Sequence, residues 1–152
     1  YDHMFLGLKP TTAIVTNMEH DHPDIYASES DYIEAFTSFM CLVPENGVFI
    51  GCSDDKLTRA LLGQAIVHGT ESVAFGFDLE TMPAGAETLQ AVNLQPNSVG
   101  GSDFLVLQNG VTLGLVRLRV PGKHNALNAL AALAAGLRAE IPFHECSEAL
   151  SG

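Results

Sequence analysis

The hydrophobic and polar positions predict strands that alternate with helices over the first half of the chain. Apolar and β-branched runs predict buried strands at 12–16, 47–52 and 72–77. Apolar residues recur at helical spacing over 30–42. A second helix is expected after Ser53-Asp54-Asp55, with one apolar face made of Leu57, Ala60, Leu61 and Ala65. Strands joined by helices in this order form a parallel sheet with right-handed crossovers.

The second half of the chain predicts antiparallel pairing. Residues 88–95 alternate in polarity, and the run 104–108 is joined to 111–120 by Asn109-Gly110, a dipeptide typical of tight hairpins. An Ala-rich helix is expected at 125–138, followed by Pro142 and a short final helix. The expected fold is therefore α/β, a mostly parallel sheet with flanking helices plus a small antiparallel sheet beside it.

Composition restricts the class of protein. A chain of 152 residues with 47% hydrophobic and 16% charged residues fits one globular domain. The formal net charge of −11 repels phosphate backbones, which argues against nucleic acid as the main partner. A small anionic ligand would need local help from a cation or from helix amides.

Cysteine usage and hydropathy indicate a cytoplasmic protein. Cys41, Cys52 and Cys146 have neither the number nor the spacing of a disulfide framework or a zinc knuckle. The longest apolar stretch, 126–137, is too short to span a membrane, and the chain does not open on a signal peptide. We therefore expect reduced thiols, no membrane partner and a cytoplasmic location.

Residues 17–24 place metal ligands directly after the first expected strand. The segment Asn-Met-Glu-His-Asp-His-Pro-Asp holds three carboxylates and two imidazoles, at the strand end where open α/β sheets bind ligands. Mg²⁺ would use one or two of these groups together with substrate phosphate, and a softer ion such as Mn²⁺ could also accept an imidazole. The alternative is an acidic turn that caps the next helix, with solvated histidines.

The stretch from His20 to Asp24 also starts like the H-x-H-x-D-H signature of the metallo-β-lactamase fold. Ile25 stands at its last position, and no downstream ligand set is obvious. Because zinc sites require a full ligand count, this interpretation is the weaker one.

Residues 121–128, Pro-Gly-Lys-His-Asn-Ala-Leu-Asn, combine a helix start with two amides. Asn125 and Asn128 are three residues apart and share one face of the first turn. Each amide offers a donor and an acceptor, which complements the N6 and N7 edge of adenine. The alternative is that Asn125 is an ordinary N-cap, Asn128 a tolerated polar residue and Lys123 a solvated cation.

Taken together, the two motifs resemble those of the Mur ligases. Residues 17–24 resemble the T-N-I-x-x-D-H-x-D segment of that family, and residues 122–129 resemble its G-x-H-N-x-x-N-A segment. The resemblance covers nearly the whole chain as part of the family's central ATPase domain. Within the family, the chain most resembles the branch that adds L-alanine to UDP-N-acetylmuramic acid in peptidoglycan synthesis. This resemblance rests on the opening residues Tyr1-Asp2-His3-Met4-Phe5 and on the sequence Asp-His-Pro-Asp at 21–24.

The resemblance implies a role for each motif. His22 corresponds to the histidine that binds the second Mg²⁺, which bridges the γ-phosphate and the substrate carboxylate. Asn125 and Asn128 correspond to the asparagines that hold the adenine of ATP, with His124 beside them. Supporting roles are expected for Asn17, Glu19, Asp21 and Asp24. In the family, ATP converts the carboxylate to an acyl phosphate, which the amine of the amino acid then attacks.

Parts of the family pattern are not found in these residues. The phosphate loop G-T-x-G-K-[ST] is absent from the sequence, and the glutamate that binds the first Mg²⁺ would precede Tyr1. We therefore expect residues 1–152 to be a partial central domain, without the UDP-binding and carboxy-terminal domains, that is inactive alone. An exposed sheet edge should make it self-associate. Two alternatives stay open: a ligase that recycles murein tripeptide, and a non-catalytic nucleotide- or metal-binding module.

Overall fold

The computed structural model describes residues 4–19, 26 and 28–152, and its strands form one six-stranded sheet in chain order. The strands are β1 (Thr12–Val15), β2 (Val48–Cys52), β3 (Glu71–Gly76), β4 (Glu87–Pro96), β5 (Ser102–Gln108) and β6 (Val111–Leu118). Neighbours from β1 to β4 are parallel, whereas β5 is antiparallel to both β4 and β6. The expected α/β class is confirmed.

The antiparallel strands continue the parallel sheet instead of forming a second one beside it. The start of β4 pairs with β3 in parallel, from Glu87 opposite Val73 to Gln90 opposite Gly76. Most of β4 also pairs with β5 in the antiparallel direction on its other edge. A single long strand thus joins the two halves, which local polarity patterns cannot show.

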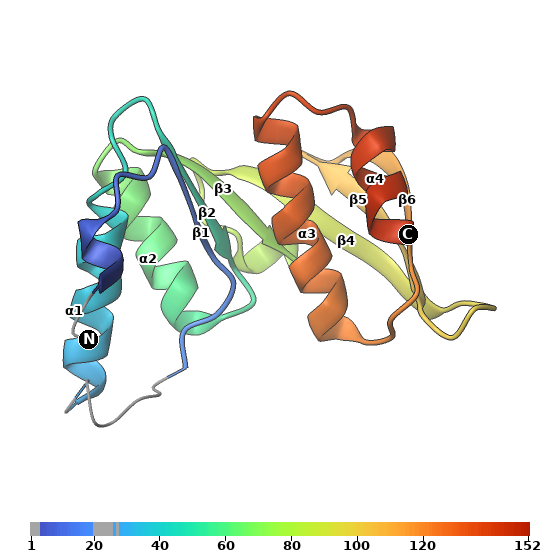
Figure 1. Ribbon diagram of the computed structural model, residues 1–152, viewed down its shortest axis with the longest axis horizontal. Coiled ribbons are helices and arrows are strands. Elements are labelled where there is room, and N and C mark those ends of the chain that lie inside the picture. Colours follow the sequence, from blue (N-terminus) through green and yellow to red (C-terminus); the bar gives the residue numbers. More distant parts are fainter. Residues whose placement is uncertain (1–3, 20–25, 27) are drawn as a thin grey trace.

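Helices cover both faces of the sheet (Figure 1). They are η1 (Met4–Gly7), α1 (Glu29–Met40), α2 (Lys56–Val67), η2 (Leu79–Thr81), α3 (Lys123–Arg138) and α4 (Phe143–Ser151). One cluster of buried side chains packs the sheet against α1 and α2, and another packs it against α3 and α4. No helix in the described ranges is long and apolar enough to cross a membrane.

Alternate residues of β2 supply both hydrophobic clusters. Val48, Ile50 and Cys52 pack toward α3, whereas Phe49 packs toward α2. All five residues of the strand are buried, because helices lie on both of its faces. This double coverage explains why the strand is a continuous apolar run.

The buried face of α2 differs from the expected one. Leu61 and Ala65 are buried as expected, but Ala60 is exposed and Leu57 is only half-buried. Thr58 and Leu62 are buried in their place. The helix begins at Lys56 after the N-cap Asp55, and this start sets the phase of its buried face.

Candidate functional site

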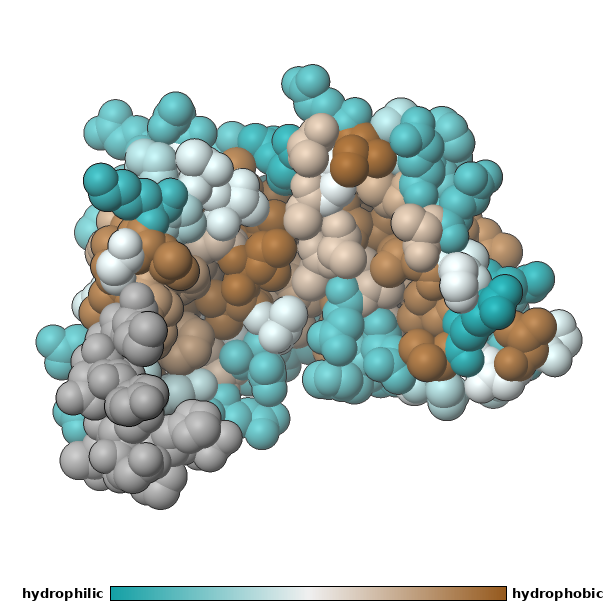
Figure 2. All heavy atoms as spheres, viewed as in Figure 1, coloured by the Kyte–Doolittle hydropathy of each residue, from teal (hydrophilic) through white to brown (hydrophobic). Residues whose placement is uncertain are grey.

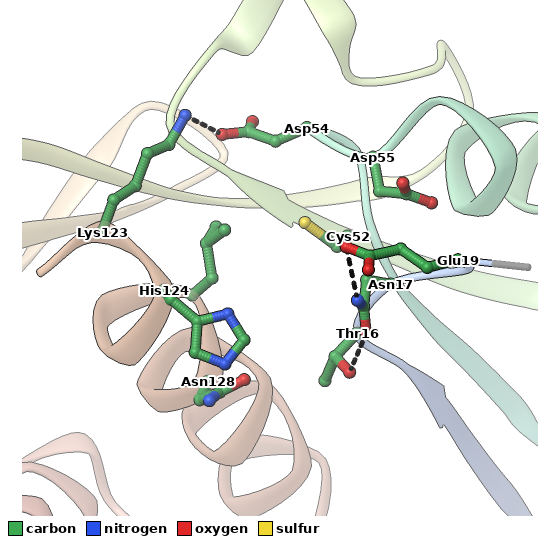
Figure 3. A pocket seen from close by; sticks show the side chains of 10 residues that line it. Thr16, Asn17, Glu19, Cys52, Asp54, Asp55, Lys123, His124 and Asn128 are labelled. Carbon is green, nitrogen blue, oxygen red and sulfur yellow. Dashed lines mark hydrogen bonds and ion pairs between the residues drawn. The ribbon is translucent and has the colours of Figure 1, made fainter. Parts of the chain in front are cut away.

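A cavity of about 330 Å³ lies where the carboxyl ends of β1 and β2 meet the first turns of α3 (Figure 3). We call it the strand-end cavity. Its lining residues are Thr16, Asn17, Glu19, Cys52, Asp54, Asp55, Lys123, His124, Leu127 and Asn128. The cavity therefore combines residues of the two sequence motifs with others that follow β2.

The segment after β1 forms one side of the cavity. The Thr16 hydroxyl donates to Asn17 Oδ1 at 3.4 Å, and Asn17 Nδ2 donates to Glu19 Oε1 at 3.3 Å. The side chain of Met18 is buried, and its backbone N–H donates to Asp55 Oδ1 at 3.3 Å. These contacts fix the chain as it leaves the sheet, so that Asn17 and Glu19 border the cavity.

The residues after β2 form the second side. Asp54 Oδ1 accepts hydrogen bonds from the backbone N–H groups of Phe77 at 3.0 Å and Asp78 at 3.4 Å. Gly76 has no side chain at the point where Asp54 approaches β3, and a Cβ atom there would collide with the carboxylate. Burial raises the pKa of the Cys52 thiol above its ordinary value, so this group stays neutral at physiological pH.

The start of α3 forms the third side. Gly122, the N-cap, has a φ of 104°, a conformation that favours glycine, and its N–H donates to Ser102 Oγ at 3.1 Å. Lys123 Nζ lies 2.9 Å from Asp54 Oδ2 and 5.0 Å from the centroid of the Phe77 ring. Lys123, for which a solvated cation was the alternative interpretation, is 60% exposed and also forms one half of an ion pair.

The two asparagines of the second motif differ in their surroundings. Asn128 lines the cavity together with His124, on the side opposite Thr16 and Asn17 (Figure 3). Asn125 does not line it, because its Nδ2 donates to the Pro121 carbonyl at 2.8 Å. The adenine contact expected of Asn125 stays a prediction, and in this structure its amide closes the turn before the helix.

The charges of the cavity favour a base over a phosphate. Among the described residues of the lining, Glu19, Asp54 and Asp55 bring three carboxylates, against the ammonium of Lys123. Carboxylates repel phosphate oxygens but accept hydrogen bonds from amines. Leu127 and Cys52 add apolar contact area for a flat ring. The chemistry of the lining therefore suits an amine-bearing base.

The described residues do not form a metal site. Within 4–19, 26 and 28–152, no group of three or more His, Cys, Asp or Glu side chains is placed to hold a metal ion. His22, Asp21 and Asp24 lie outside the described residues. The metal role expected of His22 and the supporting roles of the two aspartates stay predictions.

Asp54, Asp55 and Lys123 line the strand-end cavity but were not among the residues expected at the site. The sequence suggested Asp54 and Asp55 only as a helix cap, although they follow a parallel strand as directly as residues 17–24 do. Carboxyl ends of parallel strands meet at one edge of a sheet, and that rule would have placed both segments at the same cavity.

Comparison with known proteins places this fold in a family. Residues 2–136 match the Mur ligase middle domain. A UDP-N-acetylmuramate–L-alanine ligase of Acidothermus cellulolyticus is 38% identical over 150 residues, which cover 99% of this chain and 30% of that protein. The protein of the same name from Syntrophotalea carbinolica is 36% identical over 148 residues, which cover 97% of this chain and 30% of that protein.

Solved structures show the same architecture. The UDP-N-acetylmuramate:L-alanyl-gamma-D-glutamyl-meso-diaminopimelate ligase of Neisseria meningitides superimposes with a TM-score of 0.75 and 27% identity, covering 97% of this chain and 41% of that one. The UDP-N-acetylmuramate-alanine ligase of Thermotoga maritima gives a TM-score of 0.71 and 25% identity, covering 99% of this chain and 30% of that one. The chain thus spans about 30% of the length of the L-alanine ligases it matches. With the matched range and the fold in agreement, the chain belongs to the Mur ligase family, and its residues 2–136 match the middle domain of that family.

Proposed function

We propose that this chain is the nucleotide-binding part of an ATP-dependent ligase that joins L-alanine to UDP-N-acetylmuramic acid. The L-alanine ligases it matches at 36–38% identity support this assignment. The structural observation that carries it is the strand-end cavity, in which Asn17 and Glu19 lie across from His124 and Asn128 (Figure 3).

We propose that the cavity holds the adenine of ATP. Its volume of about 330 Å³ is at the lower end of the range of about 300–1,000 Å³ for small-molecule pockets, which suits a base better than a whole nucleoside triphosphate. The Asn17 and Asn128 amides supply a donor and an acceptor each, and the Glu19 carboxylate can accept the N6 amine. Leu127 would pack against the ring.

The triphosphate needs positive charge from outside the cavity. We propose that His22 holds Mg²⁺, or Mn²⁺ in its place, with Asp21 and Asp24 in support. When bound, the ion offsets the charge that accumulates on the transferred phosphoryl group. The phosphate loop that would hold the rest of the nucleotide is absent from these 152 residues. The described residues would therefore bind and orient the base, and we assign none of them a catalytic role.

The proposed reaction has two steps. The substrate carboxylate attacks the γ-phosphate of ATP to give an acyl phosphate and ADP. The alanine amine then attacks the acyl carbon, and inorganic phosphate leaves from a tetrahedral intermediate as the amide bond forms. Without a phosphate loop, the 152-residue chain should not perform the first step by itself.

The test is a reaction with the full-length protein that contains this chain. With ATP, Mg²⁺, L-alanine and UDP-N-acetylmuramic acid, we expect ADP, inorganic phosphate and UDP-N-acetylmuramoyl-L-alanine, and no product from the 152-residue chain in a parallel assay. If the full-length protein ligated none of the amines offered to it, the ligase assignment would be refuted. Turnover by the shorter chain would refute only its predicted inactivity.

A second candidate is a ligase that adds a tripeptide to the same nucleotide sugar. The Neisseria meningitides structure, with a TM-score of 0.75, favours it. The two candidates are distinguished by offering two amines separately to the full-length protein. An L-alanine ligase should use L-alanine, and a tripeptide ligase should use L-alanyl-gamma-D-glutamyl-meso-diaminopimelate. The third possibility, a non-catalytic module, is tested by reading the part of the gene that encodes the residues before Tyr1. A Gly-Lys-Thr or Gly-Lys-Ser phosphate loop there would exclude it.

We also propose that the 152-residue chain self-associates and that the full-length enzyme is cytoplasmic. Among the strands that the structure describes, β1 lies at one edge of the sheet, and its Ile14 is 39% exposed. Figure 2, which has the orientation of Figure 1, shows hydrophobic residues gathered near the centre of the molecule. They lie between the region of α1 and α2 and the region of α3 and α4. Exposed strand edges beside apolar surface favour pairing with another copy. A single monomeric species in sedimentation at high concentration would contradict self-association.

A further inference from the structure

Lys123 lies at the rim of the strand-end cavity, where its ammonium contacts both a carboxylate and an aromatic ring. Its ammonium lies 2.9 Å from Asp54 Oδ2 (Figure 3). The same ammonium lies 5.0 Å from the centroid of the Phe77 ring. Asp54 comes shortly after β2, Phe77 directly after β3, and Lys123 is the first residue of α3. The contact therefore joins the helix to the ends of two strands.

Asp54 is a rigid anchor for this contact. Its Oδ1 atom is held by the backbone N–H groups of Phe77 and Asp78, and its side chain is only 11% exposed. Its Oδ2 atom is buried and receives no hydrogen bond with good geometry from the described residues. The nearby ammonium is therefore the charge that compensates this oxygen.

The position of α3 decides the shape of the cavity. His124 follows Lys123 directly, and Asn128 lies just over one turn further along the helix. The hydrogen bond from Gly122 to Ser102 ties the residue before the helix to β5. The ion pair provides a second anchor, on the side where the helix faces β2 and β3.

We propose that Asp54 and Lys123 are positioning residues, which hold the α3 side of the cavity at the distance that a base requires. The inference rests on the proposed function, because it concerns the same nucleotide. It further assigns Lys123 to Asp54 and not to a phosphate of ATP. A phosphate could capture the lysine only if Asp54 Oδ2 lost its compensating charge in a mostly buried site, which is unfavourable.

Binding of adenosine and ATP to the full-length protein separates these two roles of Lys123. If the lysine positions α3, Lys123→Met should weaken binding of both ligands by the same factor, about two- to fivefold for a partly exposed ion pair. Asp54→Asn should do the same, and the double variant should be no weaker than either single variant. Lys123→Arg should restore binding, because arginine keeps the positive charge and can also make a cation–π contact with Phe77.

Lys56→Met is the matched control, since Lys56 is the first residue of α2 and does not line the cavity. We expect its affinities to equal those of the unsubstituted protein. Loss of ATP binding with unchanged adenosine binding in Lys123→Met would overturn the inference and make Lys123 a phosphate ligand. Unchanged binding of both ligands would overturn it too, while leaving the proposed function intact. If the unsubstituted protein bound neither ligand, the proposed function would fail and the inference with it.

Discussion

Asp55 Oδ1 accepts a hydrogen bond from the backbone N–H of Met18 at 3.3 Å. The same oxygen accepts the N–H of Thr58 at 2.8 Å and so caps α2. One carboxylate thus joins the exit of β1 to the start of α2. Because Met18 stands between Asn17 and Glu19, which line the strand-end cavity, the cap also holds one side of the cavity in place.

The first prediction concerns this shared cap. Asp55→Ala should lower the free energy of unfolding by about 1–2 kcal/mol, since it removes an N-cap and a second backbone contact. It should also weaken adenosine binding, because the segment after β1 loses its anchor. Urea denaturation and adenosine titration measure the two effects.

Ser28→Ala is the control for Asp55→Ala. Ser28 Oγ accepts the N–H of Asp31 at 3.2 Å and caps α1, and the serine does not line the cavity. This variant should lose about 0.5–2 kcal/mol of stability with no change in adenosine affinity. Equal loss of affinity in both variants would show that the link to Met18 has no special effect on the site.

The second prediction compares two glycines. In Gly76→Ala the new methyl group would meet Asp54 Oδ1 and would lie 2.8 Å from Ser53 Oγ. Overpacking of this kind costs about 1–3 kcal/mol of unfolding free energy and should displace Asp54 from Phe77. Gly63 lies within α2 and has open space where a Cβ atom would stand, so Gly63→Ala should instead raise stability by about 0.5–1 kcal/mol. Thermal and urea unfolding of the two variants check the opposite signs.

The sequence predicted the sheet best where burial leaves a simple pattern. β2 is buried on both faces, and the apolar run from Val48 to Cys52 reveals it directly. The phase of α2 was harder to predict, because apolar residues occur on several sides of the helix from Leu57 to Leu62. Periodicity alone could not decide between Ala60 and Leu62, and contact with the sheet buries Leu62 completely.

Within the candidate site, the sequence predicted the local structure of residues that are close in sequence, and it missed the contacts between distant segments. The spacing of Asn125 and Asn128 placed both at a helix start, which the structure shows. That the Pro121 carbonyl accepts from Asn125 depends on the path of the chain into the helix. The role of Asp54 depends on the N–H of Phe77, 23 residues away, at the end of a neighbouring strand. The spacing of residues within one segment cannot predict this hydrogen bond between two segments.

The third prediction concerns pH. Hydrogen bonds from Arg117, and then from Asn97, hold the pKa of Asp103 below its ordinary value. Arg117 Nη2 lies 2.8 Å from one carboxylate oxygen, and Asn97 Nδ2 lies 2.8 Å from the other. As the pH falls below about 4, the unfolded chain takes up this proton before the folded chain does, so acid favours unfolding. The stability that Asp103 contributes is complete above that pH and is lost as the pH falls through its lowered pKa.

Asp103→Asn isolates this contribution. The difference in unfolding free energy between the unsubstituted chain and the variant should be constant from about pH 7 to about pH 5 and should shrink below about pH 4. Urea denaturation at a series of pH values measures the difference. A difference that stayed flat or grew under acid conditions would contradict the lowered pKa of Asp103.

The last prediction separates the two asparagines of α3. Asn128 lines the strand-end cavity, whereas Asn125 donates to the Pro121 carbonyl. Asn128→Ala should weaken adenosine binding by about tenfold, which corresponds to the loss of about 1–1.5 kcal/mol of hydrogen bonding, and should leave stability nearly unchanged because the side chain is exposed. Asn125→Ala should cost about 1 kcal/mol of unfolding free energy through the lost turn contact, with a smaller effect on affinity. Calorimetric titration of the full-length protein with adenosine, paired with urea denaturation, gives both quantities for each variant. A larger loss of affinity in Asn125→Ala would mean that its amide leaves Pro121 when the nucleotide binds.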